Sequence, residues 1–117
     1  MKTDNIIQQK SFAFAVRVVK LYRYLCDEKK EYVLSKQLLR SGTSIGANVE
    51  EAIGGHSRAD FIAKLVISYK EARESSYWIR LLSETNYLDK EQSDSLLFDI
   101  DEIQKIIGLI TKTSRNS

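Results

Sequence analysis

Carboxylates are the side chains of this sequence best suited to acid–base chemistry. Two pairs stand close together in the chain, Glu50 with Glu51 and Glu71 with Glu74. A catalytic pair needs two carboxylates whose surroundings push their pKa values apart. In segments as highly charged as these, most acidic side chains are solvated or form ion pairs. We therefore predict no catalytic residue and expect that the protein is not an enzyme.

The single histidine and the single cysteine narrow the remaining chemistry. A di-iron bundle needs Glu-x-x-His motifs on two helices, which one histidine cannot supply. One histidine also excludes any zinc site with several histidine ligands. We expect His56 to be a solvated residue, or one that staples the chain, near the start of a helix. Cys26 has no histidine near it in sequence to favour a thiolate, so it is expected to be a small core residue. No metal and no cofactor is predicted.

A run of polar residues at helical spacing allows two interpretations. Its members are Arg40, Ser41, Ser44, Asn48 and Glu51. Four of them follow one another at steps of four, four and three residues, so they share one face of a helix. This face is either a binding surface or a hydrogen-bond network in which Ser44 and Asn48 pair with neighbouring helices, Glu74 being one suggested partner, and fix the register of the bundle. We favour the structural interpretation.

A basic face on the first predicted helix is the main electrostatic feature. Lys10, Arg17, Lys20 and Arg23 give this segment a local charge of +4, with no acidic residue between positions 5 and 26. Residues 89–102 carry six acids and one base. The basic face is therefore either solvated, or complementary to the acidic helix, or a nucleic-acid-binding surface. Four cations make a weak phosphate site alone, but copies around a ring would add their contributions.

Helical periodicity and short connections position these groups. Four helices are predicted at about 5–29, 35–54, 57–84 and 89–112. Ser35, Ser57 and Asp89 are candidate N-caps, and Gly54 is expected to close the second helix in the left-handed conformation. Because the connections are short, sequential helices must lie antiparallel. The sequence thus predicts an all-α, antiparallel up-down-up-down four-helix bundle, a single domain over 1–117.

Apolar residues exceed those that one bundle needs to bury. In the first helix they fill an arc of about 180°, although a helix on one side of a bundle needs little more than about 100°. The third helix carries Ile67, Trp78 and Leu81 away from its inward stripe, and we expect them to form part of a subunit interface. Gly42 and Gly46, each unfavourable in a helix by ~0.8–1 kcal/mol, predict a close helix crossing. The fourth helix has a regular apolar seam formed by Leu96, Ile100, Ile103, Ile107 and Ile110.

Length and composition fit an ordinary globular domain. The chain has 117 residues, of which 43% are hydrophobic and 29% charged, and its net charge is only +2. Such a charge does not by itself identify a nucleic-acid-binding protein. The N-terminal residues lack the apolar run of a signal peptide, and no stretch approaches the ~20 apolar residues that span a bilayer. We expect a cytoplasmic protein that does not enter a membrane.

Two motifs carry a resemblance to a known family. The pattern R-S-x-x-S-I-x-x-N-x-x-E begins at Arg40, and E-x-x-E-x-x-x-W begins at Glu71 and ends at Trp78. Over about residues 11–110 the chain resembles the bacterial 23S rRNA intervening-sequence proteins. Many of these proteins have a glycine after the last glutamate of the first motif, where this chain has Ala52.

The resemblance implies up-down bundles that assemble as homopentamers. Some members are encoded inside insertions in bacterial large-subunit rRNA genes. A related group serves diversity-generating retroelements, in which a basic pentameric barrel binds nucleic acid and a reverse transcriptase. The resemblance implies no enzymatic activity, and the biological role of the family is largely unassigned.

Two hypotheses about function follow. In the first, a homo-oligomeric, pentameric helical scaffold binds RNA or DNA through the clustered basic faces. In the second, the same oligomer is a protein-interaction adaptor that binds a protein partner and no nucleic acid. The small net charge favours the second hypothesis, and the acid-free first helix favours the first.

Overall fold

The computed structural model describes residues 2–116, with side-chain surroundings from residue 5 onward. It consists of four helices, α1 (Lys2–Asp27), α2 (Leu34–Ile53), α3 (Arg58–Glu84) and α4 (Lys90–Asn116). No strand occurs among these residues. The predicted all-α class and the four helices are therefore confirmed. The predicted limits of the domain, 1–117, include residues 1 and 117, which lie outside the described residues.

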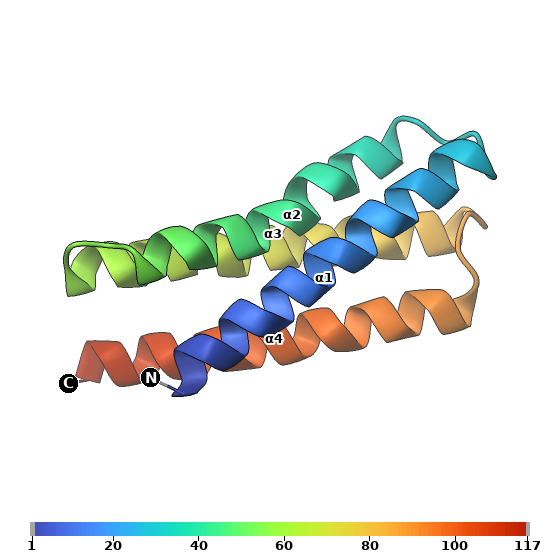
Figure 1. The fold of residues 1–117 in the computed structure, drawn as a ribbon. Coiled ribbons are helices and arrows are strands. Elements are labelled where there is room, and N and C mark those ends of the chain that lie inside the picture. The colour runs from blue at the N-terminus through green and yellow to red at the C-terminus, as the bar shows by residue number, and fades with distance from the viewer. Residues whose placement is uncertain (1, 117) are drawn as a thin grey trace.

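The helices form an elongated antiparallel bundle of about 47 × 21 × 19 Å. Each helix packs against its neighbours in sequence, and α4 closes the bundle against α1. No Cα atom described in the first helix lies within 8 Å of one in the third, so these two helices occupy opposite corners. Figure 1 shows α1 running at an angle across the front of α4. None of the helices described between residues 2 and 116 is both long and apolar enough to cross a membrane.

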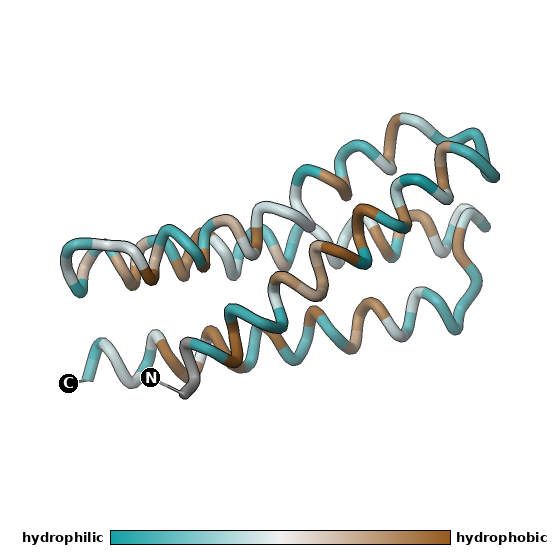
Figure 2. Tube along the Cα trace, in the orientation of Figure 1, coloured by the Kyte–Doolittle hydropathy of each residue, from teal (hydrophilic) through white to brown (hydrophobic). Residues whose placement is uncertain are grey.

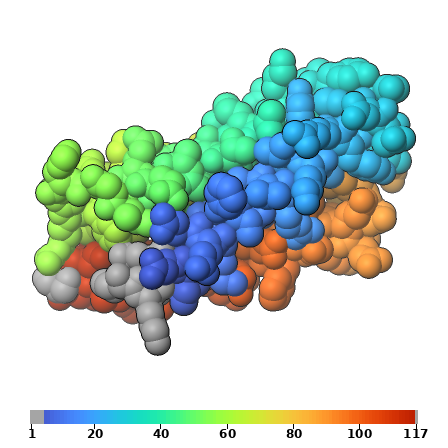
Figure 3. Space-filling model, viewed as in Figure 1, coloured from blue at the N-terminus to red at the C-terminus, as the bar shows by residue number. Residues whose placement is uncertain are grey.

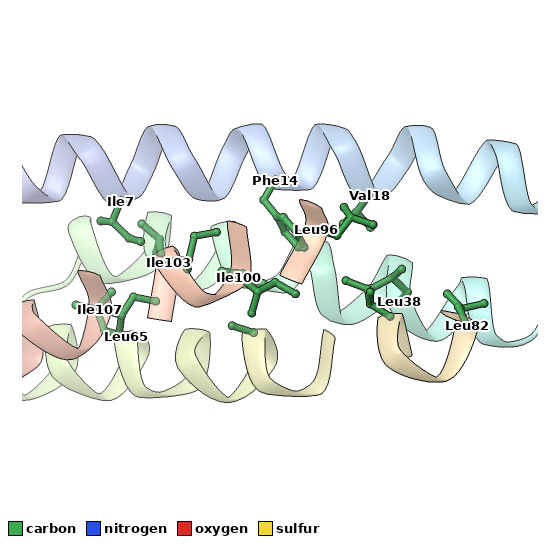
Figure 4. Packing of buried hydrophobic residues seen from close by; sticks show 14 of the residues in the cluster. Ile7, Phe14, Val18, Leu38, Leu65, Leu82, Leu96, Ile100, Ile103 and Ile107 are labelled. Carbon is green, nitrogen blue, oxygen red and sulfur yellow. The ribbon is translucent and has the colours of Figure 1, made fainter. Parts of the chain in front are cut away.

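One apolar core runs along the bundle and receives side chains from all four helices. Figure 4 shows Phe14 and Val18 of α1 pointing toward residues of the other helices, including Leu38 and Leu96. The predicted seam of α4 is confirmed, because all five of its apolar residues are buried. Burying such a stripe provides most of the stability of a helix in a bundle.

Two glycines of α2 lie where α1 comes close. A Cβ atom added at Gly42 would lie 2.7 Å from Cγ2 of Val18, and one added at Gly46 would lie 3.3 Å from the backbone oxygen of Ser11. Any larger residue at Gly42 would therefore press into a buried side chain of the facing helix. The close helix crossing predicted from these glycines is confirmed, and it joins α1 to α2.

The start of α2 differs from the prediction. Ser35 is not the N-cap but a buried residue inside the helix, and its hydroxyl donates to the backbone oxygen of Glu31 at 2.8 Å. The Glu31 carboxylate accepts from the backbone N–H groups of Val33, Leu34 and Ser35 at 2.7–3.2 Å. A glutamate from the preceding connection thus satisfies the free N–H groups that begin this helix.

The other predicted capping residues are found at their helix ends, although one glycine does not have the predicted conformation. Ser57 caps α3 by accepting from the backbone N–H of Asp60, and Asp89 accepts from the backbone N–H of Gln92 just before α4. Gly54, however, has φ −83°, so α2 does not end in a left-handed residue, and no described glycine has positive φ. The Gly54 N–H instead bonds to the backbone oxygen of Glu50, which continues the helical pattern by one residue.

The predicted bounds are correct to within a few residues at all but one helix end. The structure extends the first helix back to Lys2 and ends it at Asp27, instead of 5–29. The last helix continues to Asn116 rather than ending near 112. Polar residues such as Thr113 continue this helix because their side chains can remain exposed.

Candidate functional site

Half of the basic face of α1 is paired with the acidic face of α4. Nζ of Lys10 lies 2.9 Å from a carboxylate oxygen of Glu102, and Nη1 of Arg17 lies 2.6 Å from Asp99. The Arg17 guanidinium also donates to the Ser95 hydroxyl at 3.1 Å. Figure 3 shows the side of the molecule on which α1, in blue, lies between α2 and α4. For these two cations, the contacts favour the alternative in which the basic face of α1 complements the acidic face of α4.

The remaining cations of this face, Lys20 and Arg23, are exposed and form no ion pair with a described residue. They lie beside Phe12, Ala15, Val16 and Val19, and together these six residues line a shallow hollow of about 300 Å³ on α1. Of the four cations predicted to bind nucleic acid, two therefore have ion-pair partners and two have none within the part of the chain that the structure describes.

The polar motif of α2 faces α3, and its arginine bridges two glutamates of that helix. The Arg40 guanidinium donates to Glu71 at 3.0 Å and also to Glu74. The indole N–H of Trp78 donates to the same Glu74 carboxylate at 2.9 Å. The hydrogen bond from Trp78 and then that from Arg40 lower the pKa of Glu74, and the bond to Glu74 raises the pKa of Arg40.

Serines fix the register between α2 and α3 inside the core. The hydroxyl oxygens of Ser41 and Ser75 are 2.9 Å apart, and the Ser68 hydroxyl donates to the backbone oxygen of Ile45 at 2.8 Å. All three serines are buried. Two α-helices approach closely where their facing side chains are this small, so these pairs select one alignment of the helices.

Two members of the motif do not reach the neighbouring helix. The Ser44 hydroxyl donates to the backbone oxygen of Arg40, and the Asn48 amide donates to that of Ser44. Their side chains are short and turn back to the preceding turn of their own helix. Among the described residues, the structure does not show the expected pairing of Ser44 and Asn48 with a neighbouring helix. Glu74 binds Arg40 instead, and a carboxylate oxygen of Glu51 lies 3.5 Å from Nζ of Lys64 on α3.

The carboxylates considered for catalysis bind other side chains, and the single histidine lies away from them. Glu50 accepts from the Gln8 amide at 3.0 Å, and Glu71 and Glu74 both bind Arg40. His56 is exposed in the connection between α2 and α3, and Cys26 is half-buried with its sulfur 3.9 Å from the Ser35 hydroxyl. Within residues 2–116, no cluster of histidine, cysteine or acidic side chains could hold a metal ion.

The excess of apolar surface expected on the first and third helices is present in the folded chain. Phe12 is 68% exposed and Val16 is 38% exposed on α1. Figure 2 shows hydrophobic residues along the middle of this helix. On α3, Ile67 is 42% exposed, whereas Trp78 and Leu81 are half-buried and Trp78 also packs against the core. Phe12 is thus the most exposed of these apolar residues.

One basic cluster was not recognised in the sequence. Lys70 and Arg73 of α3 lie with Arg115 of α4 along a groove between these helices. The spacing of Lys70 and Arg73 by three residues places them on one helical face, which was the available signal. Arg115 lies more than 40 residues further along the chain, so only the antiparallel packing brings it to the same groove.

Comparisons with known proteins agree with this fold. The profile of a family described as 23S rRNA-intervening sequence protein matches residues 3–108. A crystal structure of a protein with unknown function from the S23 ribosomal protein family of Bacteroides thetaiotaomicron is 54% identical, with a TM-score of 0.93. The match covers 94% of this chain and 98% of that one. No curated protein matches the chain.

Proposed function

The chain belongs to the 23S rRNA-intervening sequence protein family, and from this premise we propose that it is a non-enzymatic scaffold that binds RNA or DNA as a homopentamer. Its copies associate through apolar faces of α1 and α3. The cations that the subunit leaves unpaired are then repeated around the assembly. Cytoplasmic RNA or DNA is the partner that such a surface would meet.

The exposed apolar face of α1 is the observation that carries the proposal. Phe12 is 68% exposed, and it adjoins Ala15, Val16 and Val19 in the hollow on this helix. Contiguous apolar patches on a small protein mark interaction surfaces. Burying an aromatic side chain stabilises an interface by removing a large apolar area from water. A second copy of the chain would provide such a cover.

The positions of the two apolar faces favour a ring. Helices α1 and α3 lie at opposite corners of the bundle. When a face on one side of a subunit binds a different face on the other side, the contact repeats head to tail and can close into a ring. Ile67, Trp78 and Leu81 are the residues of α3 that we propose to meet α1 of the next copy. Five copies is the number that the family resemblance implies.

Two exposed phenylalanines provide a matched test of this interface. Phe12 on α1 and Phe98 on α4 are 68% and 67% exposed, so replacing either changes the isolated subunit to the same small extent. We expect Phe12→Ser to lower the molar mass measured by light scattering behind size exclusion, and Phe98→Ser to leave it unchanged. Equal effects of the two substitutions, or no effect of Phe12→Ser, would contradict the proposed interface.

Nucleic-acid binding is tested separately with a labelled RNA. We expect its affinity, measured by fluorescence anisotropy, to fall as salt rises, because each neutralised phosphate releases counterions. Lys20→Gln with Arg23→Gln should weaken binding more than Lys10→Gln with Arg17→Gln, which removes the same charge from paired residues. Absence of binding at low salt, or a flat salt dependence, would refute this part of the proposal.

The adaptor hypothesis is favoured by one specific observation. The ion pairs of Lys10 and Arg17 neutralise half of the cations that were predicted to bind phosphate. If the protein is an adaptor, the apolar hollow on α1 would bind a protein partner. Capture of a single partner by the intact chain after nuclease treatment, together with no affinity for RNA at low salt, would favour the adaptor over the nucleic-acid scaffold.

A further inference from the structure

A groove between α3 and α4 combines a basic rim with an apolar floor. Its volume is about 520 Å³, within the range of ~300–1,000 Å³ typical of ligand sites. Lys70 and Arg73 contribute from α3, and Arg115 contributes from α4. Val66 provides apolar surface between them, and the buried Ile107 lies at the base of the groove. No acidic residue lines the groove.

The three cations of this groove differ from Lys10 and Arg17 of α1 in having no carboxylate partner among the described residues. None of Lys70, Arg73 and Arg115 forms an ion pair with any residue that the structure describes between 5 and 116. Three like charges beside one apolar surface repel one another unless an anion lies among them. Arginine in particular presents a planar fork of donors that matches phosphate oxygens. The groove is therefore complementary to a ligand with more than one negative charge.

A glycine in the groove is the second, independent observation. Gly108 lies within α4, where glycine is less favourable than alanine by ~0.8–1 kcal/mol. A Cβ atom added at this position would meet no atom within 4 Å, in contrast to Gly42 and Gly46. Packing inside the subunit therefore does not account for Gly108. A glycine allows a ligand to lie directly against the backbone of a helix.

An aromatic ring beside the cations favours a nucleic acid over an acidic peptide as the ligand. Tyr69 lines the same groove and is partly exposed. Single-stranded nucleic acids are bound by grooves that combine cations for the phosphates with aromatic or apolar surfaces for the bases. An acidic peptide would use the cations but would not need the open, flat surface at Gly108.

We propose that the groove formed by Lys70, Arg73, Gly108 and Arg115, with Tyr69 at its edge, binds a segment of single-stranded nucleic acid. Phosphates contact the three cations, and a base lies on the apolar floor at Gly108. This inference rests on the proposed function and adds a binding site to it. In the assembly, one such groove per subunit would extend the contact along a strand.

The test uses a fluorescein-labelled single-stranded oligouridine and fluorescence anisotropy over a salt series with the full chain. Arg73→Gln with Arg115→Gln should weaken binding about tenfold or more. The same pair of substitutions should reduce the magnitude of the negative slope of log affinity against log salt by about 1.4, because each phosphate contact on a single strand contributes ~0.7. Lys10→Gln with Arg17→Gln, which removes the same charge from ion-paired residues, is the matched control and should have a smaller effect on both quantities.

A variant without any charge change tests the floor of the groove. Gly108→Leu fills the open space, and we expect it to weaken oligouridine binding while the free energy of unfolding stays the same or rises, since leucine is a better helix former. Unchanged binding by Gly108→Leu would contradict the contact of a base with the floor. A variant that loses binding because it unfolds is recognised by its lower unfolding midpoint in urea.

The outcomes separate the groove from the wider proposal. If the parent chain does not bind oligouridine at low salt, both fail. If it binds and only Lys20→Gln with Arg23→Gln weakens binding, the groove alone is wrong. Equal affinity for a labelled oligoglutamate of the same charge would overturn the nucleic-acid assignment. A lower molar mass of Arg73→Gln with Arg115→Gln would show an interface between copies, which would also overturn it.

Discussion

The same substitution at two glycines should change stability in opposite directions. Gly42→Ala places a methyl group 2.7 Å from Cγ2 and 2.9 Å from Cγ1 of Val18. Val18 is fully buried and, as a β-branched residue in a helix, has one strongly preferred rotamer. It cannot rotate away, so α1 and α2 must separate slightly. Gly108→Ala meets no neighbouring atom.

The magnitudes follow from two opposing contributions. Alanine improves helix propensity by ~0.8–1 kcal/mol at either position. Overpacking a core typically destabilises by ~1–3 kcal/mol. We therefore expect Gly108→Ala to raise the free energy of unfolding by about 0.5–1 kcal/mol. At Gly42 the overpacking outweighs the gain, and we expect a loss of about 1 kcal/mol.

The assay is urea unfolding followed by circular dichroism, at one protein concentration because self-association contributes to apparent stability. A double-mutant cycle identifies the cause: Val18→Ala removes both methyl groups that the new Cβ meets, so Gly42→Ala should become less harmful in that background. The interpretation would be refuted if Gly42→Ala and Gly108→Ala shifted stability in the same direction. It would also be refuted if Val18→Ala left the effect of Gly42→Ala unchanged.

Three further predictions concern polar groups. Hydrogen bonds from the backbone N–H groups of Leu34, Ser35 and Val33 outweigh the opposing effect of burial and lower the pKa of Glu31. Its charge therefore stabilises the fold above its ordinary pKa, and this stability is lost as pH falls through the lowered value. Glu31→Gln should lower the free energy of unfolding at pH 7 by about 1 kcal/mol and flatten its decline in acid, which urea titrations at several pH values would measure. Trp78 is the only tryptophan, and its indole N–H donates to the Glu74 carboxylate. Its fluorescence should therefore change as acid protonates Glu74, below the ordinary pKa of a glutamate. The change should be absent in Glu74→Gln. Ser41→Ala and Ser75→Ala should be coupled in a double-mutant cycle of unfolding free energies, because each leaves the other hydroxyl without its partner across the helices; additive effects would contradict the pairing.

The helices and their core were predictable because the signals are local. Periodic apolar residues such as Ile100 and Ile107 define the buried face of a helix without knowledge of its neighbours. The capping serine Ser57 precedes its helix by one residue and was recognised in the same way. Gly42 and Gly46 predicted a close crossing, although only the structure identifies α1 as the helix that approaches.

Groups that depend on side-chain reach or on distant segments were less predictable. Glu31 caps α2 because the connection folds back with Lys30 at a φ of 55°, and no spacing rule gives this. Arg40 reaches Glu74 because its side chain is long, while Ser44 on the same face is too short. The groove of Lys70, Arg73 and Arg115 exists only when α3 and α4 pack antiparallel.

The same dependence applies to the candidate nucleic-acid surface. The sequence placed four cations on one helix, and their neutralisation by α4 was one of the alternatives. The structure pairs Lys10 and Arg17 with acidic residues and leaves Lys20 and Arg23 exposed. Which cations of a helix are neutralised depends on the register against the acidic helix. That register is set by core packing rather than by the charges themselves.

The molar mass of the unmodified chain in solution tests the proposed assembly most directly. Light scattering behind size exclusion, repeated over a dilution series down to micromolar concentration, distinguishes a subunit of 13.4 kDa from its multiples. We expect an assembly because the apolar face at Phe12 and the opposite face of α3 need partners that one subunit does not provide. We expect the mass of five chains because five is the number that the family resemblance implies. A single stable 13.4-kDa species across the series would contradict it.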